Sequence, residues 1–314
     1  MDKILVVFTG GTISCKSGPV MSADEEGGYD LIKAYRGHTG DKTEFEYASA
    51  LTILSEDHTL STMETLCRCL WETDLSKYSG VIITHGSDTL SYVSSLIALI
   101  FTGAGLPIVL TAAGKPIDDP ESNGVENFAA SVQLVKSGLC GVYAVYSGRR
   151  STEIFAGDRI IEADGYFEEF SHFGEPFGEV KNGVVRILNG NAGKRSLVSP
   201  FEFKKKVLII KAYPGIDYNV YDVTRAAAVL HIMYHSGTAC TAGVDSSFLL
   251  FAEKCRANGC PLYVLPFKGD GEDMYSSAAK IKQSGVIPLP LMSAEKAYAL
   301  LLIRVNGGQF VSVK

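Results

Sequence analysis

The sequence predicts an α/β fold, with a larger N-terminal α/β domain built on a mostly parallel sheet and a smaller C-terminal α/β domain. Short apolar runs rich in Val and Ile alternate with longer segments of helical period, and each run ends in Gly, Ser, Thr or Asp. That alternation is typical of βαβ units, in which helices cover both faces of a parallel sheet. A chain of 314 residues with 46% hydrophobic content is also long enough for two domains.

The first half of the chain is expected to contribute strands with helices between most of them. The strands are predicted at 3–9, 47–54, 80–84, 107–111 and 141–146, and the helices at 59–73, 89–102 and 123–137. The strand runs are short and apolar, whereas the helical segments are longer, and this difference in length separates the two classes.

A second unit follows a change in sequence character. Between about 149 and 205 the alternation gives way to mixed polar and aromatic sequence with many glycines. Strands are then predicted at 206–212 and 261–267 and helices at 222–234, 246–257 and 293–304, the last of which Ser293 can cap. We therefore predict a larger domain at 1–190, a linker at 191–205 and a smaller domain at 206–314.

Charge and composition exclude several classes of partner. The formal net charge is -6, and the acidic and basic residues are scattered apart from the run Lys204–Lys206. Such a run before an apolar strand is usually a solvated strand entry, so nucleic acid is not expected as a partner. The apolar stretch 95–114 is interrupted by glycines and a proline, so no membrane-spanning segment is predicted.

Cysteine usage and the N-terminal residues favour the cytoplasm. The chain has 7 cysteines, an odd and dispersed set that suits reduced thiols better than a disulfide framework. The first residues, MDKILVVFTGG, lack the basic and apolar regions of a signal peptide. Cys67 and Cys69, like Cys255 and Cys260, lack the Cys-x2-Cys spacing of a zinc site, so no metal is expected.

Polar side chains follow four of the predicted strands. The segments are Thr9–Thr12, Ser55–His58, Thr84–Thr89 and Thr111–Lys115. Open parallel sheets bind ligands beyond the carboxyl ends of their strands, so these hydroxyls and carboxylates are expected to converge.

The first of these turns, with its two glycines, can place the Thr12 hydroxyl and nearby backbone donors against a ligand. A phosphate site is the competing interpretation, but the turn lacks the Gly-Lys-Ser/Thr ending of a P-loop and the third glycine of a dinucleotide fingerprint. No nucleotide cofactor is therefore expected. Ser87 and Asp88 could simply cap a helix, but beside Thr12 they form the nucleophile, hydroxyl and carboxylate set of acyl transfer.

Two motifs at these turns resemble a known family. TGGTI at 9–13 and HGSDTL at 85–90 are similar to the two signatures of bacterial-type L-asparaginases, the second of which usually has Thr in place of Ser87. Further segments also have family counterparts: ILSEDHTL at 53–60, VLTAAGKPIDD at 109–119, AYPGID at 212–217 and GVIPLPLMSAEKA at 285–297. The resemblance thus covers nearly the whole chain.

The resemblance implies an enzyme that hydrolyses the side-chain amide of asparagine through an acyl-enzyme, without a metal or cofactor. It implies Thr12 as the attacking group, Ser87 as the second hydroxyl and Asp88 as the ligand of the substrate's amino group. Ser55 and Glu56 match the substrate-binding turn of the family, and the glycines of the two signatures, Gly11 and Gly86, would border the substrate. The family usually forms homodimers or homotetramers with sites completed across an interface.

Several departures leave alternatives open. The family segment resembling Gly-Asn-Arg-x-x-Lys corresponds to 157–162, so its activating lysine is replaced by Glu162, and Lys115 or Arg159 could restore the charge. Thr238 stands where the family tends to have Asn. The mobile lid tyrosine is assigned to Tyr29, in a loop with two glycines.

Three other functions compete with an asparaginase. A glutaminase or broader amidase would use the same nucleophile, and a catalytically impaired amino-acid binder would fit Glu162 and Thr238. An amidotransferase component acting on charged transfer RNA is less favoured, because the chain has no added domain and no basic surface signal. His231 and His235 share a face of a predicted helix, but Ile232 replaces the Glu of a zinc-hydrolase motif, which favours structural histidines.

Overall fold

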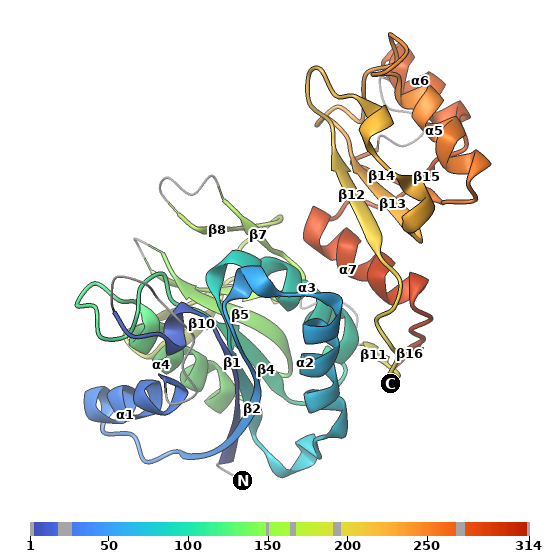
Figure 1. Cartoon of the computed structure of the whole chain (residues 1–314). Helices are drawn as coiled ribbons and strands as arrows, with labels where there is room; N and C mark the ends of the chain where they lie inside the picture. The colour runs from blue at the N-terminus through green and yellow to red at the C-terminus, as the bar shows by residue number, and fades with distance from the viewer. Residues whose placement is uncertain are drawn as a thin grey trace. The chain divides into compact units, whose positions relative to one another are not determined.

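The computed structural model describes residues 3–17, 27–148, 151–163, 168–190, 196–267 and 274–312. The chain divides into two compact units, one formed by Met1–Phe203 with Gln309–Lys314 and the other by Lys204–Gly308. The larger unit holds a mostly parallel sheet and the smaller unit a separate parallel sheet, each packed with helices (Figure 1). The predicted fold class is therefore confirmed.

The larger sheet has the strand order β10-β9-β6-β5-β4-β3-β1-β2. Its parallel part consists of β1 (Lys3–Gly10), β2 (Glu44–Ile53), β3 (Gly80–Thr84), β4 (Pro107–Thr111) and β5 (Gly141–Ser147). The strands β6 (Thr152–Ala156), β9 (Gly178–Lys181) and β10 (Val184–Ile187) continue it in antiparallel fashion. All five strands predicted for the parallel part are present within a few residues of their predicted bounds.

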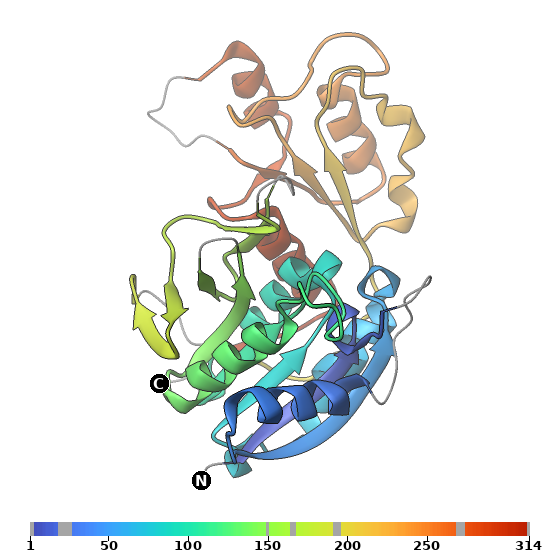
Figure 2. The same ribbon diagram turned by 90° about the vertical axis from the view of Figure 1, so that its left-hand side faces the viewer.

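Helices cover both faces of this sheet. The helices α1 (Gly27–Thr39) and α4 (Gly124–Lys136) lie on one face, and α2 (Leu60–Glu72) and α3 (Leu90–Phe101) lie on the other (Figures 1 and 2). Successive residues of a strand point to opposite faces, and β1 is apolar in both directions. Ile4, Val6 and Phe8 join the core under α1 and α4, while the alternate residues Leu5 and Val7 are equally buried.

The helix α1 escaped prediction because it opens with two glycines, which are poor helix formers. The structure explains why glycine is present at both positions. A Cβ atom on Gly27 would lie 1.9 Å from the carbonyl oxygen of Ser14, and one on Gly28 would lie 2.5 Å from the ring of Phe8. Close packing against β1 and the turn after it therefore overrides helix propensity here.

The region from 149 to 205 contains short antiparallel strands in place of βαβ units. Besides β6, β9 and β10 it holds β7 (Ile160–Glu162), β8 (Phe170–His172) and β11 (Ser196–Val198). The strand β11 pairs with β16 (Phe310–Ser312), so the end of the chain returns to the larger unit. The linker proposed for 191–205 stays a prediction, and part of it lies outside the described residues.

The smaller unit is built on a four-stranded parallel sheet of order β12-β13-β14-β15. Its elements are β12 (Val207–Lys211), β13 (Ala228–Ile232), α5 (Phe248–Ala257), β14 (Leu262–Leu265), α6 (Ser276–Gln283), β15 (Ile287–Pro288) and α7 (Ala294–Val305). The side chain of Ser293 accepts a hydrogen bond from the backbone N–H of Lys296, which confirms the predicted cap.

The helix predicted at 222–234 is wrong. A 3-10 turn, η6 (Val223–Arg225), is followed there by the buried strand β13. The run AVLHI is short and largely apolar, and periodicity alone does not distinguish a buried strand from a buried helix. Pairing with β12 and β14 on either side decides the outcome. His231 and His235 therefore do not share a helix face.

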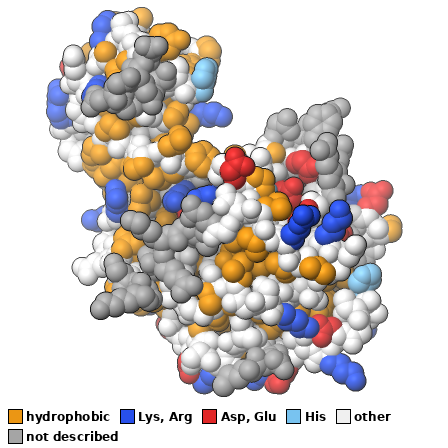
Figure 3. Space-filling view, turned by 180° about the vertical axis from the view of Figure 1, so that it is seen from behind, with side chains coloured by type: hydrophobic (Ala, Val, Ile, Leu, Met, Phe, Trp, Pro, Cys, Tyr) orange, Lys and Arg blue, Asp and Glu red, His pale blue; other side chains and the backbone are white. Residues whose placement is uncertain are grey.

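The described residues contain no membrane-spanning helix. The face drawn in Figure 3 shows no single continuous basic strip among these residues. No helix among the described residues is long and apolar enough to cross a membrane. On that face, Lys and Arg side chains are interspersed with acidic and apolar ones. The remaining short helices are the 3-10 turns η1 (Thr12–Ser14), η2 (Ser55–Asp57), η3 (Leu75–Lys77), η4 (Ser87–Thr89) and η5 (Tyr218–Val220).

Candidate active site

The strand order of the larger sheet reverses at β1. From β1 the chain moves to β2 on one side, and β3 then joins β1 on its other side. Such a reversal opens a ligand-binding crevice between the outgoing segments. The turns η1, η2 and η4 follow β1, β2 and β3, so three of the polar segments singled out in the sequence lie at the carboxyl ends of neighbouring strands.

Two glycines bring these three turns into direct contact. Gly11 has φ +75°, and a Cβ atom on it would lie 2.4 Å from both the Cα and the N atom of Gly86. A Cβ atom on Gly86 would in turn lie 2.4 Å from the Ser55 Oγ. Both positions therefore exclude a side chain, and the half-buried Thr12 follows directly after this contact.

A pocket of about 460 Å³ lies beside the η4 turn. It is lined by Ser87, Asp88, Gly114, Glu162, Ala163, Glu169 and Phe170. The structure thus brings the predicted residues Ser87, Asp88 and Glu162 together and adds Glu169, which the sequence analysis missed. Among the described lining residues there is no Lys or Arg, so carboxylates dominate the electrostatics of the pocket.

The hairpin of β7 and β8 delivers the two glutamates to the pocket. Glu162 pairs with Phe170 in this hairpin, and the backbone N–H of Ala163 donates to the carbonyl oxygen of Glu169 at 3.0 Å. The Tyr146 hydroxyl donates a hydrogen bond to the Glu169 carboxylate. Burial, with a smaller contribution from Glu169, raises the pKa of Tyr146, so its hydroxyl stays protonated as a donor.

Neither of the two cations considered from sequence lines this pocket. The Lys115 ammonium forms ion pairs with Glu121 and, at 3.8 Å, with Asp119. Arg159 lies half-buried in the turn between β6 and β7 and is absent from the described pocket lining. The negative charge introduced by Glu162 is therefore not offset by either of them at the pocket wall.

Beneath the turns, the buried His85 links two strand ends. Its Nδ1 lies 2.9 Å from the Thr9 Oγ1, whose hydroxyl donates to the Thr84 carbonyl oxygen. Its Nε2 lies 3.2 Å from the Thr89 Oγ1, whose hydroxyl donates to the Ser55 carbonyl oxygen. This chain of contacts connects η2 to η4 through Thr89.

The ring of His85 stays neutral in the folded protein. Burial, assisted by the neighbouring His58, lowers the pKa of His85 to about 3. A neutral imidazole donates through one nitrogen only, so three protons serve the four contacts of this chain. In one arrangement the Thr89 hydroxyl donates to His85 and the Ser55 carbonyl loses this donor. In the other, His85 donates to Thr89, and one of the two contacts of Thr9 has no proton.

Other predicted site residues lie elsewhere. Thr12, Glu56 and Tyr29 are not among the described residues that line the acidic pocket. Tyr29 lies in α1 and not in the predicted loop, because the helix begins at Gly27. Its side chain is 55% exposed, with its ring centroid 5.2 Å from that of Tyr47.

The second motif does not act as a simple helix cap. A 3-10 turn separates Gly86 from α3, and neither Gly86 nor Thr89 makes a side-chain capping hydrogen bond. Sequence reasoning missed Glu169 and Phe170 because the β7–β8 hairpin gave no regular alternation. Nothing near them in the sequence distinguishes a pocket wall from a surface hairpin.

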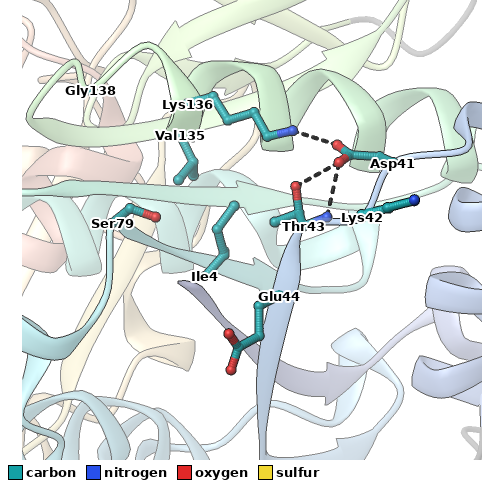
Figure 4. Close-up of a pocket in the computed structure, with 9 residues that line it drawn as sticks. All are labelled: Ile4, Asp41, Lys42, Thr43, Glu44, Ser79, Val135, Lys136 and Gly138. Atoms are coloured by element: carbon teal, nitrogen blue, oxygen red, sulfur yellow. Dashed lines mark hydrogen bonds and ion pairs between the residues drawn. The ribbon is translucent and has the colours of Figure 1, made fainter. Parts of the chain in front are cut away.

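A second pocket of about 610 Å³ lies at the opposite, amino end of the large sheet (Figure 4). In it Asp41 accepts hydrogen bonds from Lys136, from the Thr43 backbone and hydroxyl, and from the Tyr35 hydroxyl. Burial alone would raise the pKa of Asp41, but these donors hold it below its usual range. The Asp41 carboxylate thus links α1, α4 and the residue that precedes β2.

Among the described residues, no group of three or more His, Cys, Asp or Glu side chains could hold a metal ion.

Residues 3–190 match the family model described as Asparaginase, N-terminal. The chain belongs to the asparaginase family. This membership assigns it to a family of amidohydrolases and agrees with the two signature motifs at η1 and η4.

Relatives with two different names match this chain. An L-asparaginase of Thermococcus kodakarensis is 32% identical over 238 residues, a match that spans 69% of this chain and 66% of that protein. A glutamyl-tRNA(Gln) amidotransferase component of Aeropyrum pernix is 25% identical over 324 residues, spanning 96% of this chain and 74% of that protein. The asparaginase family thus includes relatives with both names.

Solved structures share the fold. The thermostable L-asparaginase from Thermococcus kodakarensis superposes with a TM-score of 0.78 at 24% identity, covering 97% of this chain and 93% of that one. L-asparaginase I from Vibrio cholerae gives a TM-score of 0.74 at 21% identity, covering 96% and 93%. A probable cytoplasmic L-asparaginase from Campylobacter jejuni gives 0.72 at 19% identity, covering 97% and 95%.

The contact between the glycine turns predicts a position-specific effect on stability. Gly11→Ala should destabilise the protein by roughly 2 kcal/mol or more, because its Cβ atom would overlap the Gly86 backbone at a positive φ. Gly37→Ala is the matched control, since nothing lies within 4 Å of a Cβ atom at this exposed position in α1. It should stabilise by about 0.5–1 kcal/mol. Denaturant unfolding of both variants measures the difference, and equal effects would contradict the close contact.

The neutral His85 predicts a pH dependence of stability. In the unfolded chain a histidine takes up a proton below pH 6.5, whereas the folded protein resists this until about pH 3. Its contribution to stability is thus complete above pH 6.5 and is lost progressively as the pH falls towards 3. Between pH 7 and 5 the wild type should lose roughly 2 kcal/mol more than His85→Asn in urea unfolding. Identical losses would show that this ring titrates normally.

Proposed function

We propose that this protein hydrolyses the side-chain amide of L-asparagine to L-aspartate and ammonia through an acyl-enzyme on Thr12. The observation that carries the proposal is the convergence of the η1, η2 and η4 turns through the Gly11–Gly86–Ser55 contacts. Membership of the asparaginase family and the similarity to named L-asparaginases support the choice of reaction.

The chemistry requires an activated hydroxyl and a polarised amide. The Thr12 Oγ1 would attack the amide carbon and form a C–O bond. The C–N bond would then break, and the leaving nitrogen would take up the proton lost by the Thr12 hydroxyl and depart as ammonia. Water would then attack the Thr12 ester, releasing aspartate and restoring the hydroxyl. Ser87 is proposed as the second hydroxyl, and the backbone around Gly11 and Gly86 as the wall against which the amide lies.

The remaining site residues are proposed to hold the substrate. Asp88 would pair with the ammonium of the amino acid, since opposite charges attract. Ser55 and Glu56, at the start of η2, would contact the substrate from the neighbouring strand end. Tyr29 lies in α1 beside Phe8 and Tyr47, and we propose that it also contacts the substrate.

The acidic wall is proposed to weaken catalysis near neutral pH. Glu162 and Glu169 add negative charge beside Asp88, where the α-carboxylate of asparagine must approach. Removal of a proton from a hydroxyl also becomes harder where negative charge accumulates. We therefore expect a modest rate with asparagine, and a homodimer or homotetramer in solution could supply further groups to the site.

One set of measurements distinguishes this proposal from two alternative functions. A glutaminase-type reaction is favoured by the similarity to an amidotransferase component over 96% of this chain. A catalytically impaired amino-acid binder is favoured by the acidic wall. Ammonia release from L-asparagine, L-glutamine and D-asparagine between pH 5 and 9, combined with calorimetric binding of asparagine, separates the three.

Thr12→Ala should lower kcat by about 10³-fold or more, because it removes the attacking oxygen. Thr12→Ser keeps that oxygen and should retain measurable activity, while unfolding temperatures of both variants check that the fold is intact. Full activity of the alanine variant would remove Thr12 as the nucleophile. Binding of asparagine without ammonia release by the wild type would instead identify a binder.

Glu162→Lys should raise activity with asparagine near neutral pH, because it replaces a negative charge at the pocket wall by a positive one. Glu162→Gln is the control that removes the negative charge without adding a cation. A higher rate in Glu162→Lys alone would indicate an activating ammonium. An equal increase in the rates of both variants would indicate relief of repulsion. Unchanged rates in both variants would exclude Glu162 from the reaction.

A further inference from the structure

The smaller unit carries a pocket of about 790 Å³ whose lining differs from that of the proposed amidase site. It is lined by Lys204, Lys205, Lys206, Val207, Leu208, Asp222, Thr224, Arg225, Ala226 and Ala227. Val207 begins β12 and Ala228 begins β13, so the pocket lies at the amino end of two adjacent parallel strands. Its size is that of a site for a metabolite-sized ligand.

Positive charge is concentrated around this pocket. Its described lining includes four basic residues and one acidic residue, Asp222. Residues 204–308 contain 12 Lys and Arg against 8 Asp and Glu, in a chain whose formal net charge is -6. The basic character therefore belongs to the smaller unit and is opposite in sign to that of the chain as a whole.

The backbone that carries the lysines is held in place from two sides. The Asn306 Oδ1, just after α7, accepts hydrogen bonds from the backbone N–H groups of Lys204 and Lys205 at 2.9 and 2.7 Å. The Asn306 Nδ2 donates to the Lys205 carbonyl oxygen, and the Ala227 N–H donates to that of Lys206. The segment is thus preorganised, which lowers the entropic cost of presenting its charges to a ligand.

The carboxylate of Asp222 does not neutralise the pocket. Its Oδ1 accepts hydrogen bonds from the Thr224 hydroxyl and backbone N–H at 2.6 and 3.0 Å, where it caps the η6 turn. These bonds, aided by the charge of Arg225, hold the pKa of Asp222 below its usual value. The described lining thus holds more cationic than anionic side chains, and this excess of positive charge favours an anionic ligand.

The remaining lining residues define the shape of a suitable ligand. An arginine guanidinium binds phosphate through two parallel hydrogen bonds, and lysines add point charges around it. Val207, Leu208, Ala226 and Ala227 contribute apolar surface beside these groups. A ligand with a phosphate group and a compact apolar body would use both kinds of surface.

We propose that this pocket binds a phosphate-bearing small molecule, with Arg225 and the Lys204–Lys206 segment contacting the phosphate and the apolar residues contacting its body. Pyrophosphate, ADP and adenosine separate the contributions of charge and body. In calorimetric titrations of the full chain at low ionic strength, pyrophosphate and ADP should bind saturably, and adenosine should not. Affinity should fall as salt is added, since exposed charges are screened.

Single substitutions test whether the pocket itself binds the anion. Arg225→Ala should weaken binding by about tenfold, the loss of one charge-assisted hydrogen-bonding group. Lys211→Ala is the matched control, because Lys211 is an exposed lysine at the other end of β12 outside the described pocket lining. Arg225→Lys, which keeps the charge and loses the fork, should bind with intermediate affinity.

Thermal unfolding provides a second readout. Without ligand, Lys206→Ala should unfold at the same or a higher temperature than the wild type, because it removes a repulsive charge. Pyrophosphate should raise the unfolding temperature of the wild type more than that of the variant. Absence of saturable binding by both anions overturns the proposal. So does an equal loss of affinity in Arg225→Ala and Lys211→Ala, since that would indicate the general charge of the unit.

Discussion

The contact between the Gly11 and Gly86 backbones is the constraint on which the candidate site depends. The carboxyl ends of β1 and β3 approach so closely that neither position has room for a Cβ atom. Because Gly86 also lies against the Ser55 Oγ, the same contact fixes the turn after β2. A side chain at either glycine would push these three turns apart. Their hydroxyls and carboxylates are the groups that we propose as the amidase site.

The residues around this contact are connected by a hydrogen-bonded chain that has fewer donor protons than contacts. The neutral His85 connects Thr9 to Thr89, and Thr89 connects to the Ser55 carbonyl. Such a network is rigid in position but has more than one pattern of donors. Above the contact the pocket wall is acidic, because the β7–β8 hairpin brings Glu162 and Glu169 beside Asp88. The family resemblance leads us to expect a lysine at position 162, so Glu162 is a predicted departure from the family.

The two units differ in the sign of the charge that surrounds their pockets. In the larger unit carboxylates line the pocket beside Ser87, and in the smaller unit lysines and Arg225 line the pocket at the amino ends of β12 and β13. The first arrangement favours a ligand with an ammonium group, and the second favours an anion. Each pocket thus selects for a different chemistry, and neither choice follows from the shared α/β architecture.

The sequence by itself determined the strands of the parallel sheet, the two signature turns and the family, because buried strands are short apolar runs and the glycines and hydroxyls at their ends are local features. It did not determine α1, whose glycines oppose helix formation, or β13, whose short apolar run does not distinguish a buried strand from a buried helix. Only the tertiary structure decided that Glu169 and Glu162 line the same pocket and that Lys115 forms an ion pair with Glu121. It also decided that Arg225 lines the same pocket as the three lysines. These groupings depend on contacts between segments distant in the chain, and local propensity carries no information about such contacts.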